Sequence, residues 1–407
     1  MANMNHSLLI LLLIILFSSI LSFGASHNIF TTYWPQSDGT PSFNVMRYGA
    51  KSDGRTDSTG AFVSAWNLAC GSNRPAIVYV PPGRFLLKKV VFQGPCKNSA
   101  IFFRLDGTLV APSDYKVLGY GGDWLVFWRV TGVTISGGTL EGQGAGLWAC
   151  KASGGNCPSG AASLRFTNSD NIAINGLTSL NSQMFHIIIY GCHDVKIRGV
   201  TVSAPEDSPN TDGINVQMST SVTILNSRIG TGDDCISIGP GTSYLYIENI
   251  RCGPGHGISI GSLGKEYKEP GVHNVVVKRV YFYGTQNGVR IKTWGRPSTG
   301  FVKNVVYQHV EMNNVQNPIL VDQNYCPSNK NCPGQQSGVQ VSDIRYHDIS
   351  GTSATQVAVK FDCSKKYPCR RIHLENVALT YNNGQANAIC HNAHGSALGF
   401  VQPSSCL

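Results

Sequence analysis

Acidic residues are scarce in this chain, yet three of them fall at a regular interval in its middle. Only 23 of the 407 residues are aspartate or glutamate. Asp212, in the stretch SPNTDGIN, lies 21 residues before Asp233, and Asp234 of GTGDDCISIG lies 22 residues before His256 of GPGHG. If the chain returns to the same side once in each interval, these groups become neighbours. Glycines surround them and permit the backbone to bend there.

Three carboxylates held close together repel one another, so one of them is expected to keep its proton. A neutral carboxylic acid beside ionised carboxylates is what glycoside cleavage requires, because an acid protonates the leaving oxygen and a base activates water. A fourth motif, GVRIKTW, begins near Arg290, which lies 34 residues after His256. Arg290 and Lys292 are two residues apart on an expected strand and share one face. Such a pair of cations suits the carboxylate of an acidic sugar.

Each motif taken singly has a simpler interpretation. Adjacent aspartates are typical of a surface turn or a calcium site, a Gly-His-Gly is typical of a flexible turn, and Arg-Ile-Lys is typical of a solvated strand face. The common interval favours the catalytic interpretation, because independent turns rarely align by chance.

A repeated strand pattern explains the interval. Short alternating β segments recur at spacings of 23, 27, 23, 30 and 30 residues, as NIAING at Asn171, DVKIRG at Asp194, SVTILN at Ser221, YLYIEN at Tyr244, NVVVKR at Asn274 and NVVYQH at Asn304. A period in this range, without a helical pattern between the strands, predicts an all-β solenoid, a right-handed parallel β-helix. A β-sandwich is disfavoured, because it would show tight hairpin signals at about ten-residue spacing.

In a β-helix, equivalent positions of successive coils lie about 4.8 Å apart. The inward positions should therefore stack into one apolar core, with Asn and Gly at the corners. We expect this core to contain Ile172, Ile174, Val195, Ile197, Val222, Ile224, Ile247 and Val275. The open end of a solenoid needs a cap, and residues 57–71 predict a short capping helix with Phe62, Ala65, Trp66 and Ala69 on one face.

The first 24 residues resemble a secretory signal peptide. A ten-residue apolar run, Leu8 to Phe17, precedes the small residues Ser22 and Gly24. An uncleaved membrane anchor is the alternative. No later stretch is long and apolar enough to span a bilayer. We expect a mature chain, residues 25–407, that forms one domain and acts outside the cell.

The 13 cysteines fit an oxidising compartment. Several are close enough in sequence to close short disulfide loops, and Cys70 is suited to tie the end of the capping helix to Cys96. Because 13 is odd, one thiol is left over, and Cys192, in an apolar stretch, is the candidate for a buried free cysteine. The short-loop pairs are Cys150 and Cys157, Cys326 and Cys332, Cys363 and Cys369, and Cys390 and Cys406.

The net charge of +9 favours an anionic partner. Lysines and arginines are scattered, without a basic helix or an RNA-binding motif, so nucleic acid is not the expected partner. An acidic cell-wall polysaccharide fits better. We expect no metal or other cofactor, no membrane contact after signal cleavage, and a monomer.

These motifs closely resemble those of the polygalacturonases, the pectin-hydrolysing glycoside hydrolases of family 28, and the plant members above all. The four hallmark motifs NTD, GDD, GHG and RIK occur in order at residues 210–212, 232–234, 255–257 and 290–292. Flanking segments match as well: FNVMRYGAKSDGRTDSTGAF, CGPGHGISIGSLGK and VDQNYC. The resemblance implies a parallel β-helix that hydrolyses α-1,4-linked galacturonan with inversion and without a metal.

The resemblance also implies a role for each matching residue. Asp233 corresponds to the general acid, Asp212 and Asp234 to the pair that activates water, and His256 to a neighbour that supports the acid's protonation state. Substrate contacts are implied for Asn210, Arg290, Lys292 and Tyr325, and a disulfide for Cys235 with Cys252. At one position the chain departs from the family pattern: Asn215 stands where many members have histidine, which puts one substrate contact in doubt.

Three questions stay open at this point. Stacking alone would separate the carboxylates by about 5 Å, which favours retention rather than inversion. The substrate is the second question, because a calcium-dependent pectate lyase, a hydrolase of branched pectin and a non-catalytic wall-binding protein are alternatives. Endo or exo action is the third question, and it depends on the loops that close the ends of the binding cleft.

Overall fold

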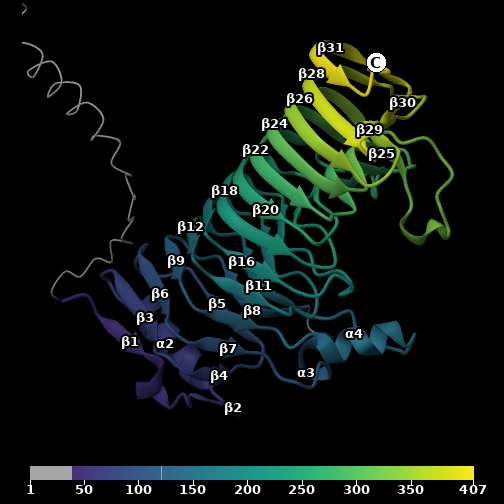
Figure 1. Ribbon diagram of the computed structural model, residues 1–407. Helices are drawn as coiled ribbons and strands as arrows, with labels where there is room; N and C mark the ends of the chain where they lie inside the picture. The colour runs from purple at the N-terminus through teal and green to yellow at the C-terminus, as the bar shows by residue number, and fades with distance from the viewer. Residues whose placement is uncertain (1–38, 121) are drawn as a thin grey trace, which may run out of the picture. The chain divides into compact units, whose positions relative to one another are not determined.

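Nearly all strands pair in parallel with the strands one coil before and one coil after them. The computed structural model describes residues 39–120 and 122–407, and Pro41–Leu407 forms one unit. Within it the chain winds through successive coils, which Figure 1 shows stacked from the purple end to the yellow C-terminus. This is the expected all-β parallel β-helix. Only the short hairpin of β28 (Cys369–Tyr381) with β29 (Gly384–Gln385) is antiparallel among the pairs in the described ranges.

Two sheets line the coils. The smaller one, called sheet B here, contributes one strand per coil and carries the motifs of interest: β5 (Val90–Gln93), β8 (Asp123–Trp128), β11 (Ala162–Thr167), β14 (Ile187–Tyr190), β17 (Ile214–Gln217), β19 (Ile236–Ile238), β21 (Ile258–Leu263), β23 (Asn287–Trp294), β25 (Asn317–Tyr325), β27 (Val357–Asp362) and β30 (Asn387–His391).

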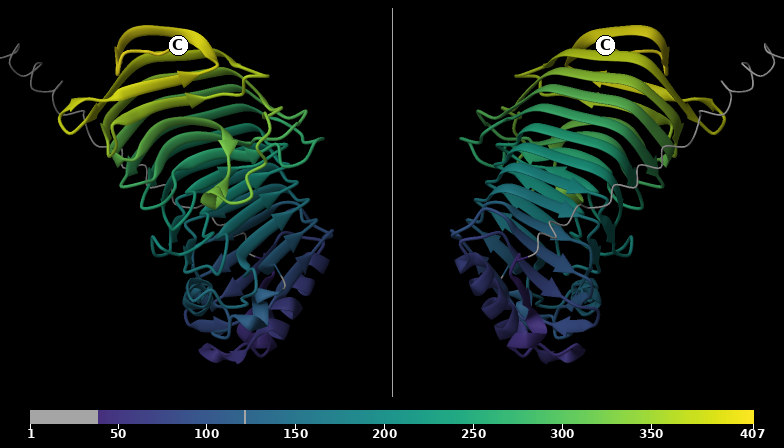
Figure 2. Two further views of the ribbon diagram at one scale, coloured as in Figure 1. Left: turned by 90° about the vertical axis from the view of Figure 1, so that its right-hand side faces the viewer. Right: turned by 90° about the vertical axis from the view of Figure 1, so that its left-hand side faces the viewer.

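The larger one, sheet A, curls around the rest of each coil. The early coils contribute two short strands each, and from β18 (Thr220–Gly230) onward one long strand takes their place. Both β15 (His193–Arg198) and β16 (Thr201–Ser203) pair with β18. Figure 2 shows the long stacked strands side-on. Its strands are β1 (Ser42–Asn44), β2 (Asp53–Asp57), β3 (Ala76–Val80), β4 (Arg84–Leu86), β6 (Ile101–Leu105), β7 (Thr108–Val110), β9 (Val133–Ser136), β10 (Thr139–Glu141), β12 (Asp170–Asn175), β13 (Thr178–Leu180), β15 (His193–Arg198), β16 (Thr201–Ser203), β18 (Thr220–Gly230), β20 (Ser243–Cys252), β22 (Val272–Tyr283), β24 (Phe301–Val315), β26 (Gln340–Ser353), β28 (Cys369–Tyr381), β29 (Gly384–Gln385) and β31 (Ala393–Gln402).

The repeated pattern marks a left-handed backbone position in every coil. The first residue of each of the six motif copies has a positive φ between 51° and 57°: Asn171, Asp194, Ser221, Tyr244, Asn274 and Asn304. Asparagine tolerates this conformation better than most residues because its short amide can bond locally. Neighbouring asparagines also bond between coils, as Asn249 Nδ2 donates to Asn226 Oδ1 over 2.8 Å. The expected role of asparagine at bends of the coil is therefore confirmed.

The core is a set of ladders of apolar side chains. Val195 pairs with Val222, then Leu245 and Val275 follow in the same column. All eight expected core residues are buried. Helix α2 (Thr59–Gly71) lies at the purple end of the stack (Figure 1), with Phe62, Ala65, Trp66 and Ala69 buried as expected. The other helical segments are η1 (Val45–Tyr48), α3 (Lys116–Gly119), α4 (Ala145–Ala152) and η2 (Pro327–Asn329).

Six disulfides brace the described residues, and each pairing agrees with the sequence-based expectation. They join Cys70 to Cys96, Cys150 to Cys157, Cys235 to Cys252, Cys326 to Cys332, Cys363 to Cys369 and Cys390 to Cys406. Cys192 is free and buried. The predicted signal peptide, residues 1–24, lies outside the described residues. In the described ranges, no helix has the length and apolar character needed to cross a membrane.

Candidate active site

Backbone hydrogen bonds between coils align the polar motifs. Gly213 N donates to Asp234 O over 2.9 Å, and His256 N donates to Asp233 O over 2.8 Å. The motifs occupy the turns that lead into β17, β19 and β21 of sheet B, while Arg290 follows within β23. The single-coil interval in the sequence therefore corresponds to one circuit of the solenoid, and the predicted site residues come together.

Glycine is required where these turns pack against each other. Gly257 has a φ of +87°, and a β-carbon there would lie 2.1 Å from Asn287 O. Gly255 has a φ of +142°, and its β-carbon would lie 2.6 Å from Asp233 O. Both conformations are rare for residues that carry a side chain. The two glycines thus allow His256 to approach the aspartates of the preceding coil.

A hollow of about 340 Å³, called the cleft here, opens over these coils. Five of the predicted residues line it directly: Asn210, Asp212, Asp233, Lys292 and Tyr325. Asn215, at which the chain departs from the family pattern, also lines the cleft and donates from Nδ2 to Ser237 Oγ over 2.7 Å.

The Asp233 carboxylate contacts a histidine ring, a backbone N–H group and an asparagine amide. Its Oδ1 lies 3.0 Å from His256 Nδ1 and accepts from the backbone N of Asp234 over 2.8 Å. Its Oδ2 accepts a weaker contact from Asn210 Nδ2 over 3.5 Å. The Asp233 side chain is 18% exposed, so one face remains open to the cleft.

Asp234 lies behind the cleft at the centre of a buried ion triad. Its Oδ1 accepts from Arg290 Nη2 over 2.8 Å and from Ser259 Oγ over 2.9 Å, while its Oδ2 accepts from Lys292 Nζ over 2.8 Å. Arg290 Nε in turn donates to Ser259 Oγ over 2.9 Å. Asp234 is fully buried, and Arg290 and Lys292 are 8% and 7% exposed. The two cations thus neutralise Asp234, an arrangement that the sequence alone does not predict.

Tyr325 completes one wall of the cleft at the end of β25. The ammonium of Lys292 lies 5.3 Å from the centre of the Tyr325 ring. Trp294 packs edge-on against this ring, at 5.5 Å between centroids, and donates from Nε1 to Ser262 Oγ over 3.2 Å. Lys292 is therefore held between a carboxylate and an aromatic face, with a third side open to the cleft.

The pKa values of two carboxyls in the cleft are shifted in opposite directions. Burial raises the pKa of Asp212 well above its ordinary value, and the negative charges of Asp233 and Asp234 raise it further. Burial also acts to raise the pKa of Asp233, but the hydrogen bond and charge of His256, together with Lys292, outweigh burial and lower it. The protein's own groups therefore place the proton on Asp212, whereas the family resemblance implies a protonated Asp233.

Sequence reasoning missed several residues of the site. Ser237 lies 22 residues before Ser259 and pairs with it, and Ser259 pairs with Arg290 on the next coil. This interval equals that between Asp234 and His256, so the serines were detectable by the same argument. Lys265 and Glu269 also line the cleft. They belong to a loop between coils, where no repeat predicts a position.

The only cluster in the described ranges that could hold a metal ion is Asp233, Asp234 and His256, whose ligand atoms lie within 4.8 Å of one another. Both oxygens of Asp234 already bind a cationic side chain. A divalent ion would have to displace Arg290 or Lys292 or add to their charge. These residues therefore do not fit a resident divalent cation.

Known proteins resemble this chain over most of its length. The model of the family "Glycosyl hydrolases family 28" matches residues 70–406. A polygalacturonase of Prunus persica is 64% identical over 90% of this chain and 93% of its own length, and an exopolygalacturonase of Platanus acerifolia is 44% identical over 91% and 98%.

Solved structures support the fold. The endo-xylogalacturonan hydrolase of Aspergillus tubingensis superposes with a TM-score of 0.76 at 23% identity, over 88% of this chain and 100% of that one. A polygalacturonase of Erwinia carotovora superposes with a TM-score of 0.67 at 24% identity, over 86% and 97%. With the family model matching most of the sequence and close relatives covering nearly its full length, the chain belongs to glycosyl hydrolases family 28.

Proposed function

We propose that the protein is a polygalacturonase that hydrolyses the α-1,4-galacturonosidic bonds of pectin by acid and base catalysis with inversion. The observation that carries this proposal is the convergence of Asp212, Asp233 and Lys292 on one cleft from different coils. Two carboxyls of opposite pKa direction supply a proton donor and a base, and the cation suits a sugar carboxylate. The polygalacturonases among the relatives support the same substrate.

In this proposal Asp233 donates the proton to the leaving oxygen, and Asp212 acts as the base for the attacking water. The protein's own charges and burial favour the opposite distribution of the proton. Lys292 is one of the charges that hold the Asp233 pKa low. A galacturonate carboxylate bound at Lys292 adds negative charge beside both carboxyls and opposes the lowering effect of Lys292 on each pKa. Bound substrate therefore favours protonation of Asp233, without by itself removing the proton from Asp212.

Asp234 has a supporting role in this mechanism. Both of its oxygens are bound to cations and it is fully buried, so it has no direct route to the cleft. We therefore propose a role for Asp234 that differs from the water activation, shared with Asp212, that the resemblance implies. Asp234 fixes Lys292 and Arg290 for the substrate carboxylate, and its charge helps raise the pKa of Asp212. His256 sits on Asp233 and tunes its proton affinity.

Asn210 and Tyr325 complete the proposed substrate contacts. Both line the cleft, one beside Asp233 and one beside Lys292. A sugar bound between them would meet the acid on one side and the cation on the other.

The activity test uses de-esterified polygalacturonate. Release of reducing ends, with no rise in ultraviolet absorbance from unsaturated product and no loss of rate with a chelator, is expected of the hydrolase. A chelator-sensitive reaction that yields unsaturated product would refute it and indicate a lyase. The configuration of the first-formed product, followed by proton NMR, tests inversion; an initial retained anomer refutes that part.

The roles of Asp212 and Asp233 are separated by leaving-group chemistry. We compare Asp233→Asn and Asp212→Asn on trigalacturonate and on a nitrophenyl oligogalacturonide, whose leaving group needs no proton. Both variants should lose at least about 100-fold on trigalacturonate. Only Asp233→Asn should recover on the activated substrate. Recovery of Asp212→Asn instead would reverse the assignment.

We also propose that residues 1–24 are removed on secretion and that residues 25–407 act as one monomeric domain in the cell wall. The disulfides of the described residues support an oxidising compartment. N-terminal sequencing of secreted protein and its mass in solution are the tests; retention of residues 1–24 or a stable oligomer would contradict them.

A further inference from the structure

A second hollow lies near the C-terminal end of the solenoid, and it is strongly basic. It has a volume of about 320 Å³ and shares no lining residue with the cleft. The segment CSKKYPCRR, residues 363–371, supplies most of its wall. Its lining residues are Gln340, Val341, Ser342, Lys366, Tyr367, Pro368, Arg370 and Arg371. We call it the basic pocket.

Most of the positive charge of the basic pocket is uncompensated. Arg371 binds Asp343 through two nitrogens, at 2.5 and 2.8 Å. Lys366 and Arg370 line the pocket, and Lys365 precedes Lys366 in the sequence without lining it. All three are exposed, and none of them forms an ion pair with any residue in the described ranges. Three free cations within six residues repel one another, so an anionic ligand would relieve their repulsion.

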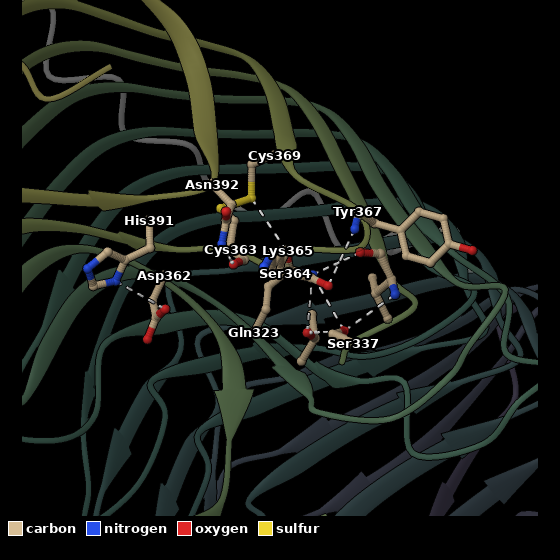
Figure 3. The surroundings of a disulfide bond; sticks show 12 residues. Gln323, Ser337, Asp362, Cys363, Ser364, Lys365, Tyr367, Cys369, His391 and Asn392 are labelled. Carbon is tan, nitrogen blue, oxygen red and sulfur yellow. Dashed lines mark hydrogen bonds and ion pairs between the residues drawn. A yellow bond between two sulfur atoms is a disulfide. The ribbon is translucent and has the colours of Figure 1, made fainter. Parts of the chain in front are cut away.

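The loop that carries these cations is held in place before any ligand binds. The Cys363–Cys369 disulfide closes it, and Figure 3 shows the hydrogen bonds around that bond. Ser364 N donates to Gln323 Oε1, and Lys365 N donates to Gln336 Oε1, each over 3.0 Å. A fixed loop loses little conformational entropy on binding. The basic pocket is thus a built feature of the solenoid.

An aromatic ring accompanies the charges. Lys366 Nζ lies 5.5 Å from the centre of the Tyr367 ring, and Figure 3 shows this ring directed away from the hydrogen-bonded group around the disulfide. Tyr367 is half-buried, so part of the ring is accessible. The faces of aromatic rings pack well against apolar surfaces such as the C–H face of a sugar ring, while cations bind its carboxylate.

The same combination continues onto neighbouring coils. Ser342 pairs with Arg370 on one side and with Lys303 on the other, so Lys303 and Arg370 lie in one column, two rungs of about 4.8 Å apart. Lys303 Nζ lies 4.8 Å from the Phe301 ring centre, and Phe301 stacks on His273. A flexible chain with one charge per sugar can follow such a column, whereas a single small anion would use only the pocket.

We propose that the basic pocket, together with the adjoining column of Lys303, Ser342 and Arg370, is a second, non-catalytic site for an acidic polysaccharide. The proposal rests on the substrate class proposed above, and it adds a surface that holds the polymer while the cleft cuts it. A second contact on one long chain raises the effective concentration of substrate at the cleft. Short oligomers that cannot reach both places gain nothing from it.

The test compares Lys366→Ala/Arg370→Ala with Lys51→Ala/Lys97→Ala. The control pair loses the same charge from exposed residues that line neither hollow. On long de-esterified polygalacturonate, the pocket variant should raise KM by about three- to tenfold, the range for the loss of two exposed charge contacts. Its kcat and its kinetics on trigalacturonate should match wild type, and the control should match on both substrates.

The kinetic outcomes separate this inference from the proposed function. If the pocket variant and the control give equal KM values on the polymer, the second site is refuted while hydrolysis stands. If the pocket variant also loses activity on trigalacturonate, the effect reaches the cleft and the inference is likewise refuted.

Tyr367→Ala separates a sugar site from simple charge attraction. Electrophoresis through gels that contain polygalacturonate or polyphosphate measures binding to each polyanion. Tyr367→Ala should weaken retardation by polygalacturonate and leave retardation by polyphosphate unchanged. An equal effect on both, or on neither, would refute the polysaccharide assignment.

Discussion

Removal of one carboxylate from the site should destabilise the protein, and removal of its neighbour should stabilise it. Asp234→Asn leaves Arg290 and Lys292 buried without their counter-charge. Breaking one side of a buried, hydrogen-bonded ion pair costs about 3–5 kcal/mol in the free energy of unfolding. Asparagine keeps the shape and one acceptor oxygen, so we expect a loss near the lower end of this range.

Asp212→Asn should have the opposite sign at neutral pH. The folded-state pKa of Asp212 lies well above its unfolded value near 3.8, because of burial and neighbouring negative charge. A raised carboxyl pKa means that the folded state binds the proton more tightly, so this contribution to stability is present at low pH. It is lost as the pH rises from the unfolded pKa through the folded one. Because the folded state holds this proton more tightly than the unfolded state, we expect Asp212→Asn to stabilise the protein at pH 7.

Chemical and thermal unfolding at pH 4 and pH 7, with the disulfides intact, measures both effects. The benefit of Asp212→Asn should grow between the two pH values, whereas Asp234→Asn should be destabilised at both. Asp207→Asn is the matched control, because Asp207 is exposed and should change stability by less than about 0.5 kcal/mol. A stable Asp234→Asn, or an Asp212→Asn that is weakened at pH 7, would refute the electrostatic account of the site.

Three further predictions concern the acid, the free thiol and the cap. Asp233 has the lower of the two carboxyl pKa values, so its titration sets the acidic limb of the pH profile of kcat/KM. His256→Ala removes the hydrogen bond and charge that lower the Asp233 pKa, so this limb should move to higher pH; an unmoved limb would contradict the proposed tuning. Burial raises the pKa of Cys192 to about 11, so the native protein should resist alkylation at pH 8 and react only when unfolded, as mass spectrometry would detect. Trp66→Ala removes a fully buried ring that packs against Phe92 and Phe127, and it should cost about 3–5 kcal/mol in denaturant unfolding; a cost below about 1 kcal/mol would mean that α2 is not an essential cap.

Most of the fold was predictable because of the repeat. Side chains of equivalent positions face the same way on each coil, so the interval between Asp212 and Asp233 was enough to predict that they meet. The apolar core positions followed from the same rule. The short-loop disulfides followed from the small number of residues between their cysteines. Residues of the loops between coils, such as Lys265, obey no repeat and were not predictable.

The ion pairs and protonation states of the site were harder to predict from the sequence. Both cations of the Arg-Ile-Lys motif were expected to face the substrate, because the period of a strand says which face a residue occupies but not how far its side chain extends. The long side chains of Arg290 and Lys292 reach Asp234 from another coil. The location of the proton depends on burial and on charges at several ångströms, and neither can be read from the order of residues.

The stacking of coils divides the chain into two kinds of sequence that can change independently. A residue within a ladder contacts the coils before and after it, so a substitution there must suit both neighbours. The excursion between β25 and β26 leaves the ladder and is closed by its own Cys326–Cys332 bond. Segments of this kind can lengthen, shorten or change charge without moving Asp212 or Asp233. Divergence within such a scaffold is therefore expected to alter which polymers are admitted sooner than it alters how a bond is broken.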